Sequence, residues 1–304
     1  MKRFLLAITA LLTITTYAIA HAQQQTSTEP APFEPLTQAD LQIITGNVQR
    51  PNGVVWFNNK LYASCTGDLT LYEIDASTGA TITYIGGIEN AHTLYPEATE
   101  TNALSLWLPN YVTNELLHVS RQGIERIAEG LNGPWGIAAL DEERFAITNL
   151  LGNSLAIVSR EGETQTLLEG RLASPTGITL DSDNLYIANN GSTRRAIMSY
   201  PIADLDNPDG EPTVLVSGLQ NTTGLAMGTD GYLYFAYSLG TRGLVGRIDP
   251  TYCAEHGGCT AEDIDIVLYT ELEAPIAGLT LSDDMRLYLH TMFRPDIYWV
   301  QIPS

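Results

Sequence analysis

The chain has 304 residues, of which 35 are Asp or Glu and 15 are Lys or Arg, so that its formal net charge is −20 at pH 7. Phosphate groups are held by clustered Lys and Arg, and this composition therefore argues against nucleic acid and anionic membrane as partners. A strongly acidic surface keeps a protein soluble, and it also attracts cations or basic partners.

The first 22 residues have the pattern of a secretory signal peptide. Lys2 and Arg3 precede an apolar run over residues 4–19, and Ala20-His21-Ala22 is a small-x-small cleavage site. The sequence predicts cleavage after Ala22 and a secreted or periplasmic protein. The polar, Pro-rich stretch that follows predicts a flexible spacer over residues 23–40.

One phrase recurs along the rest of the chain. A small-residue turn is followed by Gly, an apolar strand, a turn with Asp or Asn, and an aromatic-rich strand. A period of roughly 40–50 residues built from short strands is typical of propeller blades. The repeat glycines are Gly53, Gly136, Gly177, Gly224 and Gly278.

The repeats predict an all-β fold, a six-bladed β-propeller over residues 41–304. The blades are placed at residues 49–88, 89–130, 131–170, 171–217, 218–270 and 271–304; the second lacks the repeat Gly. The last repeat ends after three strands, and a spare strand at residues 41–45 precedes the first. Together they make one complete blade, which closes the ring and protects both sheet edges.

Several repeats resemble NHL repeats and the six-bladed superfamily that contains gluconolactonase (senescence marker protein) enzymes, paraoxonase and strictosidine synthase. The resemblance is carried by residues 175–178, 185–190, 135–138 and 147–154, which read PTGI, LYIANN, WGIA and ITNLLGNS. It implies a propeller with its site at the channel mouth. For gluconolactonase-like relatives it also implies calcium and the hydrolysis of lactones or esters.

In the gluconolactonase-like relatives, Asn or Asp precedes the repeat Gly in several blades. Here Asn52 alone matches, while Trp135, Thr176, Thr223 and Ala277 take the corresponding places in other repeats. A partial metal site remains, with hard oxygen ligands of the kind that calcium prefers. Its candidate ligands are Asn52, Asp68, Asn149 and Asn189; the alternative is that these residues only shape their turns.

Two histidines, His92 and His290, are expected near the mouth. As a pair they can act as general base and acid, or bind a transition metal; singly, each is an ordinary buried or exposed histidine. The residues expected to bind an organic ligand are Trp135, Thr176, Thr223 and Tyr237. The aromatic side chains among them form a rim for flat ligands or, alternatively, pack between blades.

Three cysteines complete the candidate residues. Cys253 and Cys259 enclose a short polar segment with His256, which predicts a disulfide in an exported protein, with a soft-metal site as the alternative. Cys65 lies in a strand-like stretch and is predicted to be a small buried apolar residue.

Two functions remain open. The first is a monomeric propeller that binds a small molecule, glycan or protein at the channel mouth without catalysis. The second is a calcium-assisted lactonase or ester hydrolase with an atypical ligand set, in which His92 or His290 transfers protons.

Overall fold

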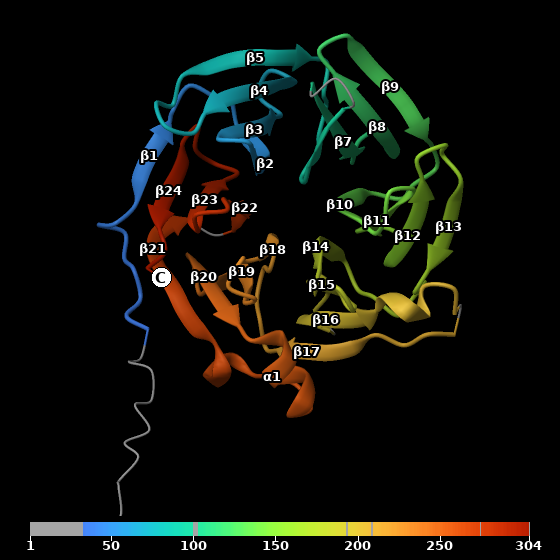
Figure 1. Ribbon diagram of the computed structural model, residues 1–304. Coiled ribbons are helices and arrows are strands. Elements are labelled where there is room, and N and C mark those ends of the chain that lie inside the picture. Colours follow the sequence, from blue (N-terminus) through green and yellow to red (C-terminus); the bar gives the residue numbers. More distant parts are fainter. Residues whose placement is uncertain (1–32, 100–102, 193, 208, 274, 304) are drawn as a thin grey trace, which may run out of the picture. The chain divides into compact units, whose positions relative to one another are not determined.

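The computed structural model describes residues 33–99, 103–192, 194–207, 209–273 and 275–303. The predicted signal peptide and the first part of the predicted spacer lie outside these residues. The described strands form six antiparallel four-stranded sheets arranged as a ring, with one strand of each sheet next to the axis (Figure 1). The predicted six-bladed β-propeller is confirmed.

The first five blades use consecutive strands. Blade one consists of β2 (Pro51–Phe57), β3 (Lys60–Cys65), β4 (Thr70–Asp75) and β5 (Thr81–Gly86), and blade two of β6 (Tyr95–Ala98), β7 (Leu104–Asn110), β8 (Glu115–Ser120) and β9 (Gly123–Ala128). Blade three consists of β10 (Pro134–Ala139), β11 (Arg144–Asn149), β12 (Ser154–Ser159) and β13 (Thr164–Leu167). Blade four consists of β14 (Pro175–Leu180), β15 (Asn184–Asn189), β16 (Ala196–Pro201) and β17 (Thr213–Ser217), with the short helix η1 (Ile202–Asp204). Blade five consists of β18 (Leu225–Met227), β19 (Leu233–Leu239), β20 (Arg242–Ile248) and β21 (Asp265–Glu273).

The sixth blade joins the two ends of the propeller. It combines β22 (Ile276–Leu281), β23 (Arg286–Thr291) and β24 (Ile297–Gln301) with β1 (Gln42–Thr45). Strand β1 pairs antiparallel with β24, and the blue and red ribbons lie side by side in Figure 1. The predicted closure of the ring by an N-terminal strand is confirmed.

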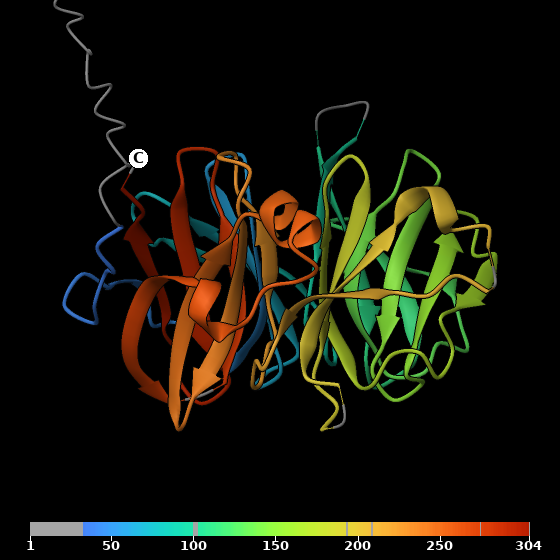
Figure 2. The same cartoon turned by 90° about the horizontal axis from the view of Figure 1, so that it is seen from below.

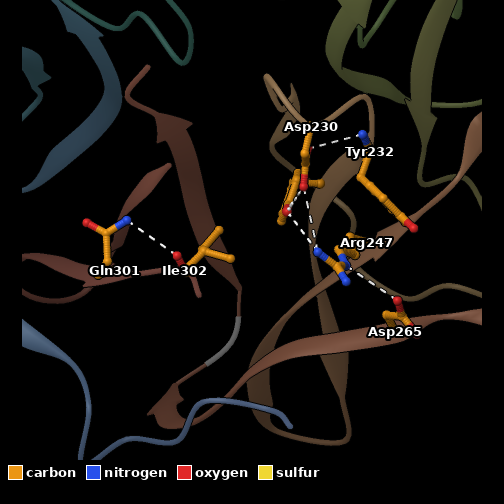
Figure 3. A network of polar contacts seen from close by, with 7 residues as sticks. Asp230, Tyr232, Arg247, Asp265, Gln301 and Ile302 are labelled. Atoms are coloured by element: carbon orange, nitrogen blue, oxygen red, sulfur yellow. Dashed lines mark hydrogen bonds and ion pairs between the residues drawn. The ribbon is translucent and has the colours of Figure 1, made fainter. Parts of the chain in front are cut away.

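The packed chain begins before residue 41. The amide of Leu36 donates to the Val267 carbonyl at 2.9 Å, and the Tyr269 amide donates to the Leu36 carbonyl at 2.8 Å. The Phe33 ring lies 4.5 Å from the guanidinium of Arg247, which also lies 3.3 Å from the Tyr234 hydroxyl. The same guanidinium forms ion pairs with Asp230 and Asp265 (Figure 3). The backbone hydrogen bonds of Leu36 add a short segment to the outer strand of blade five, and the Phe33 contact adds to them. The end of the predicted flexible spacer, residues 33–40, therefore packs against blade five.

The repeat glycines are explained by contact between neighbouring inner strands. A Cβ atom at Gly136 would lie 2.5 Å from the Thr176 carbonyl oxygen, and one at Gly177 would lie 2.5 Å from the Thr223 oxygen. Thr176 and Thr223 each precede the repeat Gly of the next blade. A side chain here would force the blades apart, so the recurring phrase records backbone packing round the axis.

Apolar side chains fill the spaces between blades, as they do between packed sheets. The cluster between blades three and four, for example, contains Leu155, Ile157, Leu185, Ile187 and Met198. Cys65 is buried, as predicted. No helix among the described residues is long and apolar enough to cross a membrane.

An insertion between β20 and β21 carries the helices α1 (Pro250–Glu255) and η2 (Ala261–Asp263), seen in orange in Figure 2. The Asp249 carboxylate caps α1 by accepting the Thr251 amide at 2.9 Å. Cys253 and Cys259 form the predicted disulfide. The Cys259 amide donates to the Leu215 carbonyl at 2.7 Å, which ties the insertion to β17 of blade four.

Candidate functional site

The predicted site residues lie at one end of the ring. Asn52, Trp135 and Thr176 are each the second residue of an inner strand, and Pro134 and Pro175 are paired with Asn149 and Asn189 at the ends of second strands. Inner strands therefore begin, and second strands end, at the same end of the ring, which we call the mouth.

Four side chains form the mouth cluster, which we define as Asn52, His92, Tyr111 and Trp135. The rings of His92 and Trp135 are stacked, with centroids 3.2 Å apart and planes inclined by 8°. Tyr111 presents its ring edge-on to both, with centroid distances of 5.6 Å to His92 and 6.0 Å to Trp135. The cluster joins blades one, two and three and the connection between blades one and two.

Asn52 fixes the protonation of His92. Its amide nitrogen lies 3.0 Å from His92 Nδ1 and 3.4 Å from His92 Nε2, and it also donates to the side-chain oxygen of Asn90. An amide nitrogen only donates, and the shorter contact assigns Nδ1 as the acceptor, which leaves the proton of the neutral ring on Nε2. Burial, together with the nearby His290, lowers the pKa of His92 to about 3. At neutral pH the ring is therefore uncharged and its Nε2–H is a hydrogen-bond donor.

His290 lies behind the inner strands. It is fully buried, and a Cβ atom at Gly278 would lie 2.9 Å from its Nε2. Burial lowers the pKa of His290 to about 4, against the opposing effect of the Thr291 and Pro51 carbonyls. The two predicted imidazoles are thus close enough to influence each other electrostatically, but His290 is sealed between blades six and one.

Buried polar atoms without a hydrogen-bond partner gather at the mouth. Among the described residues they include Trp135 Nε1, Thr222 Oγ1, His290 Nε2 and Thr291 Oγ1. Most buried polar groups in proteins have a partner, so these atoms mark hydrogen-bonding capacity that the described contacts leave unused. Trp135 Nε1 stands out because its ring is part of the mouth cluster.

The other predicted ligand-binding residues have structural contacts. The Thr176 hydroxyl donates to the Thr222 carbonyl at 2.8 Å, and the Thr223 hydroxyl donates to the Ile276 carbonyl. Both hydroxyls thereby connect neighbouring blades. Tyr237 packs against Phe235 with ring centroids 5.6 Å apart, and burial raises the pKa of its hydroxyl. The structure does not place Tyr237 in the mouth cluster.

The predicted metal ligands each make their own hydrogen bonds within the protein. Asp68 is exposed and accepts the hydroxyl hydrogen of Tyr72. Asn149 accepts the Asn132 amide at 3.1 Å and donates to the Ser154 hydroxyl at 3.3 Å.

Asn189 is held in the same way: its side chain accepts the Ala173 amide at 2.7 Å and donates to the Arg194 carbonyl at 2.6 Å. Both of these asparagines thus shape the loops at the ends of their strands, as turn asparagines do.

These residues do not fit a calcium ion. Calcium takes six to eight oxygen ligands, carboxylates among them. No three His, Cys, Asp or Glu side chains in the described ranges gather into a group that could hold a metal. The groups that shift the pKa values of His92 and His290 also include no acid. We therefore derive no chemical step through a metal.

Asn90 and Tyr111 were not anticipated. Both are neighbours of expected positions, since Asn90 precedes His92 by two residues and Tyr111 follows Asn110 in the loop after the second strand. Reading every residue of the loops that border the mouth, rather than one position per repeat, would have included them.

Comparisons with known proteins agree on the fold. No protein-family model and no curated protein matches the sequence. Among solved structures, a gluconolactonase from Xanthomonas campestris has a TM-score of 0.65 at 14% identity over 86% of this chain and 89% of that one. The calcium-binding protein regucalcin from Agrobacterium tumefaciens has a TM-score of 0.64 at 13% identity over 88% of this chain and 95% of that one.

A third similar structure is a catalytically inactive His-to-Ala variant of virginiamycin B lyase from Staphylococcus aureus, with quinupristin. Its TM-score is 0.56 at 18% identity over 82% of this chain and 81% of that one. At these identities the likeness shows the fold. The chain is a β-propeller whose architecture is that of gluconolactonase-like and regucalcin structures, as the resemblance of its repeats implied.

Proposed function

We propose that the mouth cluster binds the carbonyl group of a small cyclic ester and promotes its hydrolysis, which is a lactonase activity. The observation that carries the proposal is the buried Trp135 Nε1–H, which has no partner among the described residues and belongs to a ring stacked on the neutral His92. A carbonyl oxygen is the acceptor that such a donor lacks.

The two rings supply neutral donors for developing negative charge. Nε2–H of His92 and Nε1–H of Trp135 would donate to the carbonyl oxygen as water adds to the carbonyl carbon. The ring C–O bond then breaks, the leaving oxygen takes a proton and a hydroxy acid forms. Loss of one such donor costs about 3 kcal/mol of transition-state stabilisation in other enzymes. A histidine whose pKa is lowered suits this role, because it donates without carrying charge.

One similar structure supports a cyclic ester as the substrate class, since it is named a gluconolactonase. Export of this chain is also part of the proposal, and the disulfide supports it, since such bonds persist in oxidising compartments.

A second candidate is binding of a carbonyl compound without catalysis. It is favoured by the lack of any acid among the groups that shift the pKa of His92, because a hydrolase usually activates water with a nearby base. Turnover separates the two candidates, since both require the same contacts with a carbonyl oxygen.

The test is a panel of neutral lactones incubated with the wild-type protein, Trp135→Phe and Trp299→Phe. Phe keeps the stacked ring but removes the N–H. Trp299 lies on β24, away from the mouth cluster, and serves as the matched control. We expect turnover to fall about 100-fold in Trp135→Phe alone. Binding without turnover would favour the second candidate, and equal turnover by all three proteins would contradict the first.

A further inference from the structure

A cavity lies between blades one and two, at the end of the ring opposite the mouth. Strand β2 starts at the mouth with Pro51 and ends at Phe57, which pairs with Lys60 across the hairpin. Six residues of strand place this hairpin about 20 Å from Asn52. The cavity, which we call the Lys60–Arg121 cleft, has a volume of about 330 Å³; its lining includes Lys60, Tyr62, Glu73, Tyr84, Arg121 and Gln122.

The cleft carries surplus positive charge. Glu73, whose side chain is 12% exposed, accepts Lys60 on one oxygen and Arg121 on the other, the latter at 2.6 Å. Lys60 and Arg121 are 45% and 47% exposed, so both cations also face solvent. Two cations share one carboxylate, which leaves one uncompensated positive charge in a chain of net charge −20.

The remaining donors and one wall of the cleft suit an organic anion. Within the described part of the chain, Arg121 meets Glu73 through Nη2, and its Nε and Nη1 have no protein acceptor. A guanidinium edge of this kind binds carboxylate in a bidentate manner. The Tyr84 ring lies 4.7 Å from the Arg121 guanidinium and packs edge-on against Tyr62, with centroids 5.7 Å apart. Tyr84 is 6% exposed, and the half-buried Phe57 and Leu104 complete the apolar wall of the cleft, on which a flat apolar group can rest.

The corresponding cleft between blades two and three lacks these properties. Arg160 pairs with Glu97 at 2.8 Å and is covered by Trp107 and Phe145, whose ring centroids lie 4.9 and 4.8 Å from its guanidinium. The rest of the lining includes the acids Asp141 and Glu142. The same position one blade further on is therefore acidic, and the surplus charge is not repeated there.

We propose that the Lys60–Arg121 cleft is a binding site for a singly charged organic carboxylate with a flat apolar body. Its one surplus charge matches a monoanion, Arg121 and Lys60 hold the carboxylate, and the body lies against Tyr84. This site is separate from the mouth cluster and does not depend on its function.

The experiment is calorimetric titration of the wild-type protein with benzoate, benzamide and inorganic phosphate. Benzamide has the same shape without the charge, and phosphate has charge without the flat body. The variants are Arg121→Gln and Lys60→Met, with Arg144→Gln as the control, because Arg144 has a similarly exposed ion pair with Asp141. A melting curve for each variant confirms that it is folded.

We expect wild-type protein and Arg144→Gln to bind benzoate at least tenfold more tightly than benzamide, and more tightly than phosphate. Arg121→Gln should weaken benzoate binding by tenfold or more, the effect of losing a charged hydrogen bond, and Lys60→Met should weaken it to a smaller extent. The proposal is overturned by equal affinities for benzoate and benzamide, by no binding at millimolar benzoate, or by binding that survives in both variants. Tighter binding of phosphate than of benzoate would overturn the role given to Tyr84.

Discussion

The mouth cluster and the Lys60–Arg121 cleft differ in how far their ionisable side chains are buried. His92 is 5% exposed, and burial lowers its pKa to about 3, whereas Lys60 and Arg121 are nearly half exposed and both pair with Glu73. Burial without an acid neutralises an imidazole, while a cation at the surface has water and a carboxylate as partners. One end of the ring is thus suited to a neutral carbonyl, and the other to an anion.

The largest expected effect separates the two regions by function. The double variant Trp135→Phe/His92→Gln removes both proposed donors, so lactone turnover should fall at least about 1,000-fold. Benzoate binding in the Lys60–Arg121 cleft should stay within a factor of two of the wild-type value. Parallel loss of both activities, in a protein that retains its melting temperature, would contradict the independence of the two sites.

A carboxylate beside His92 would give the mouth cluster an acid next to a basic side chain, as Glu73 does in the Lys60–Arg121 cleft. The Asn52 amide nitrogen lies 3.0 Å from His92 Nδ1. Asn52→Asp replaces this amide with a negatively charged carboxylate. The pKa of His92 should rise by about 1–3 units, because a nearby negative charge favours the imidazolium. Titration of the histidine ring signals by NMR measures this change, and Asn90→Asp is a weaker variant of the same kind. An unchanged pKa would show that Asn52 does not set the protonation of His92.

Protein stability should decrease in mild acid because of the mouth. The unfolded chain binds a proton on each histidine near pH 6.5, whereas folded His92 and His290 do so only near pH 3 and 4. The unfolded state then holds more protons, so the free energy of unfolding is highest above pH 6.5 and falls as the pH decreases toward 4. The loss should be of the order of 2 kcal/mol for each histidine between pH 7 and 4.5.

Urea unfolding at several pH values measures this loss. His92→Gln should remove about half of the pH dependence. His256→Gln changes an exposed histidine on the insertion and serves as the control, with the wild-type dependence expected. A wild-type stability that does not vary between pH 7 and 4.5 would contradict the burial of neutral imidazoles at the mouth.

The smallest effect is expected in the cleft. Arg121→Gln should lower the free energy of unfolding by less than about 1 kcal/mol, because exposed ion pairs contribute little and Lys60 remains on Glu73. Chemical denaturation of Arg121→Gln beside Arg144→Gln tests this. A loss of several kcal/mol would mean that the Glu73 pair holds blades one and two together, and that the cleft is a structural junction.

The fold could be predicted because its signals are local. The repeat glycines mark where inner strands meet, since a Cβ at Gly177 would strike the next blade, and the spare strand at residues 41–45 matched a final blade that lacked one. The disulfide followed from two cysteines close in sequence. The packing of Phe33 and Leu36 on blade five was missed because their partners lie more than 200 residues away.

The site was harder to predict because its contacts connect different blades. The positions of Asn52, His92 and Trp135 could be read from the repeats, but the stacking of two rings from different repeats could not. The sequence also does not distinguish an asparagine that faces a ligand from one that holds its own loop. Asn149 and Asn189 hold their loops, while Asn52 reaches His92.

The most direct test of the central claim is the infrared carbonyl stretch of a carbonyl-¹³C lactone bound to the protein. Donation by His92 and Trp135 weakens the C=O bond. The bound lactone should therefore absorb at a lower frequency in the wild-type protein than in Trp135→Phe/His92→Gln, with Trp299→Phe giving the wild-type frequency. The same frequency in all three proteins would contradict a carbonyl held by these two rings.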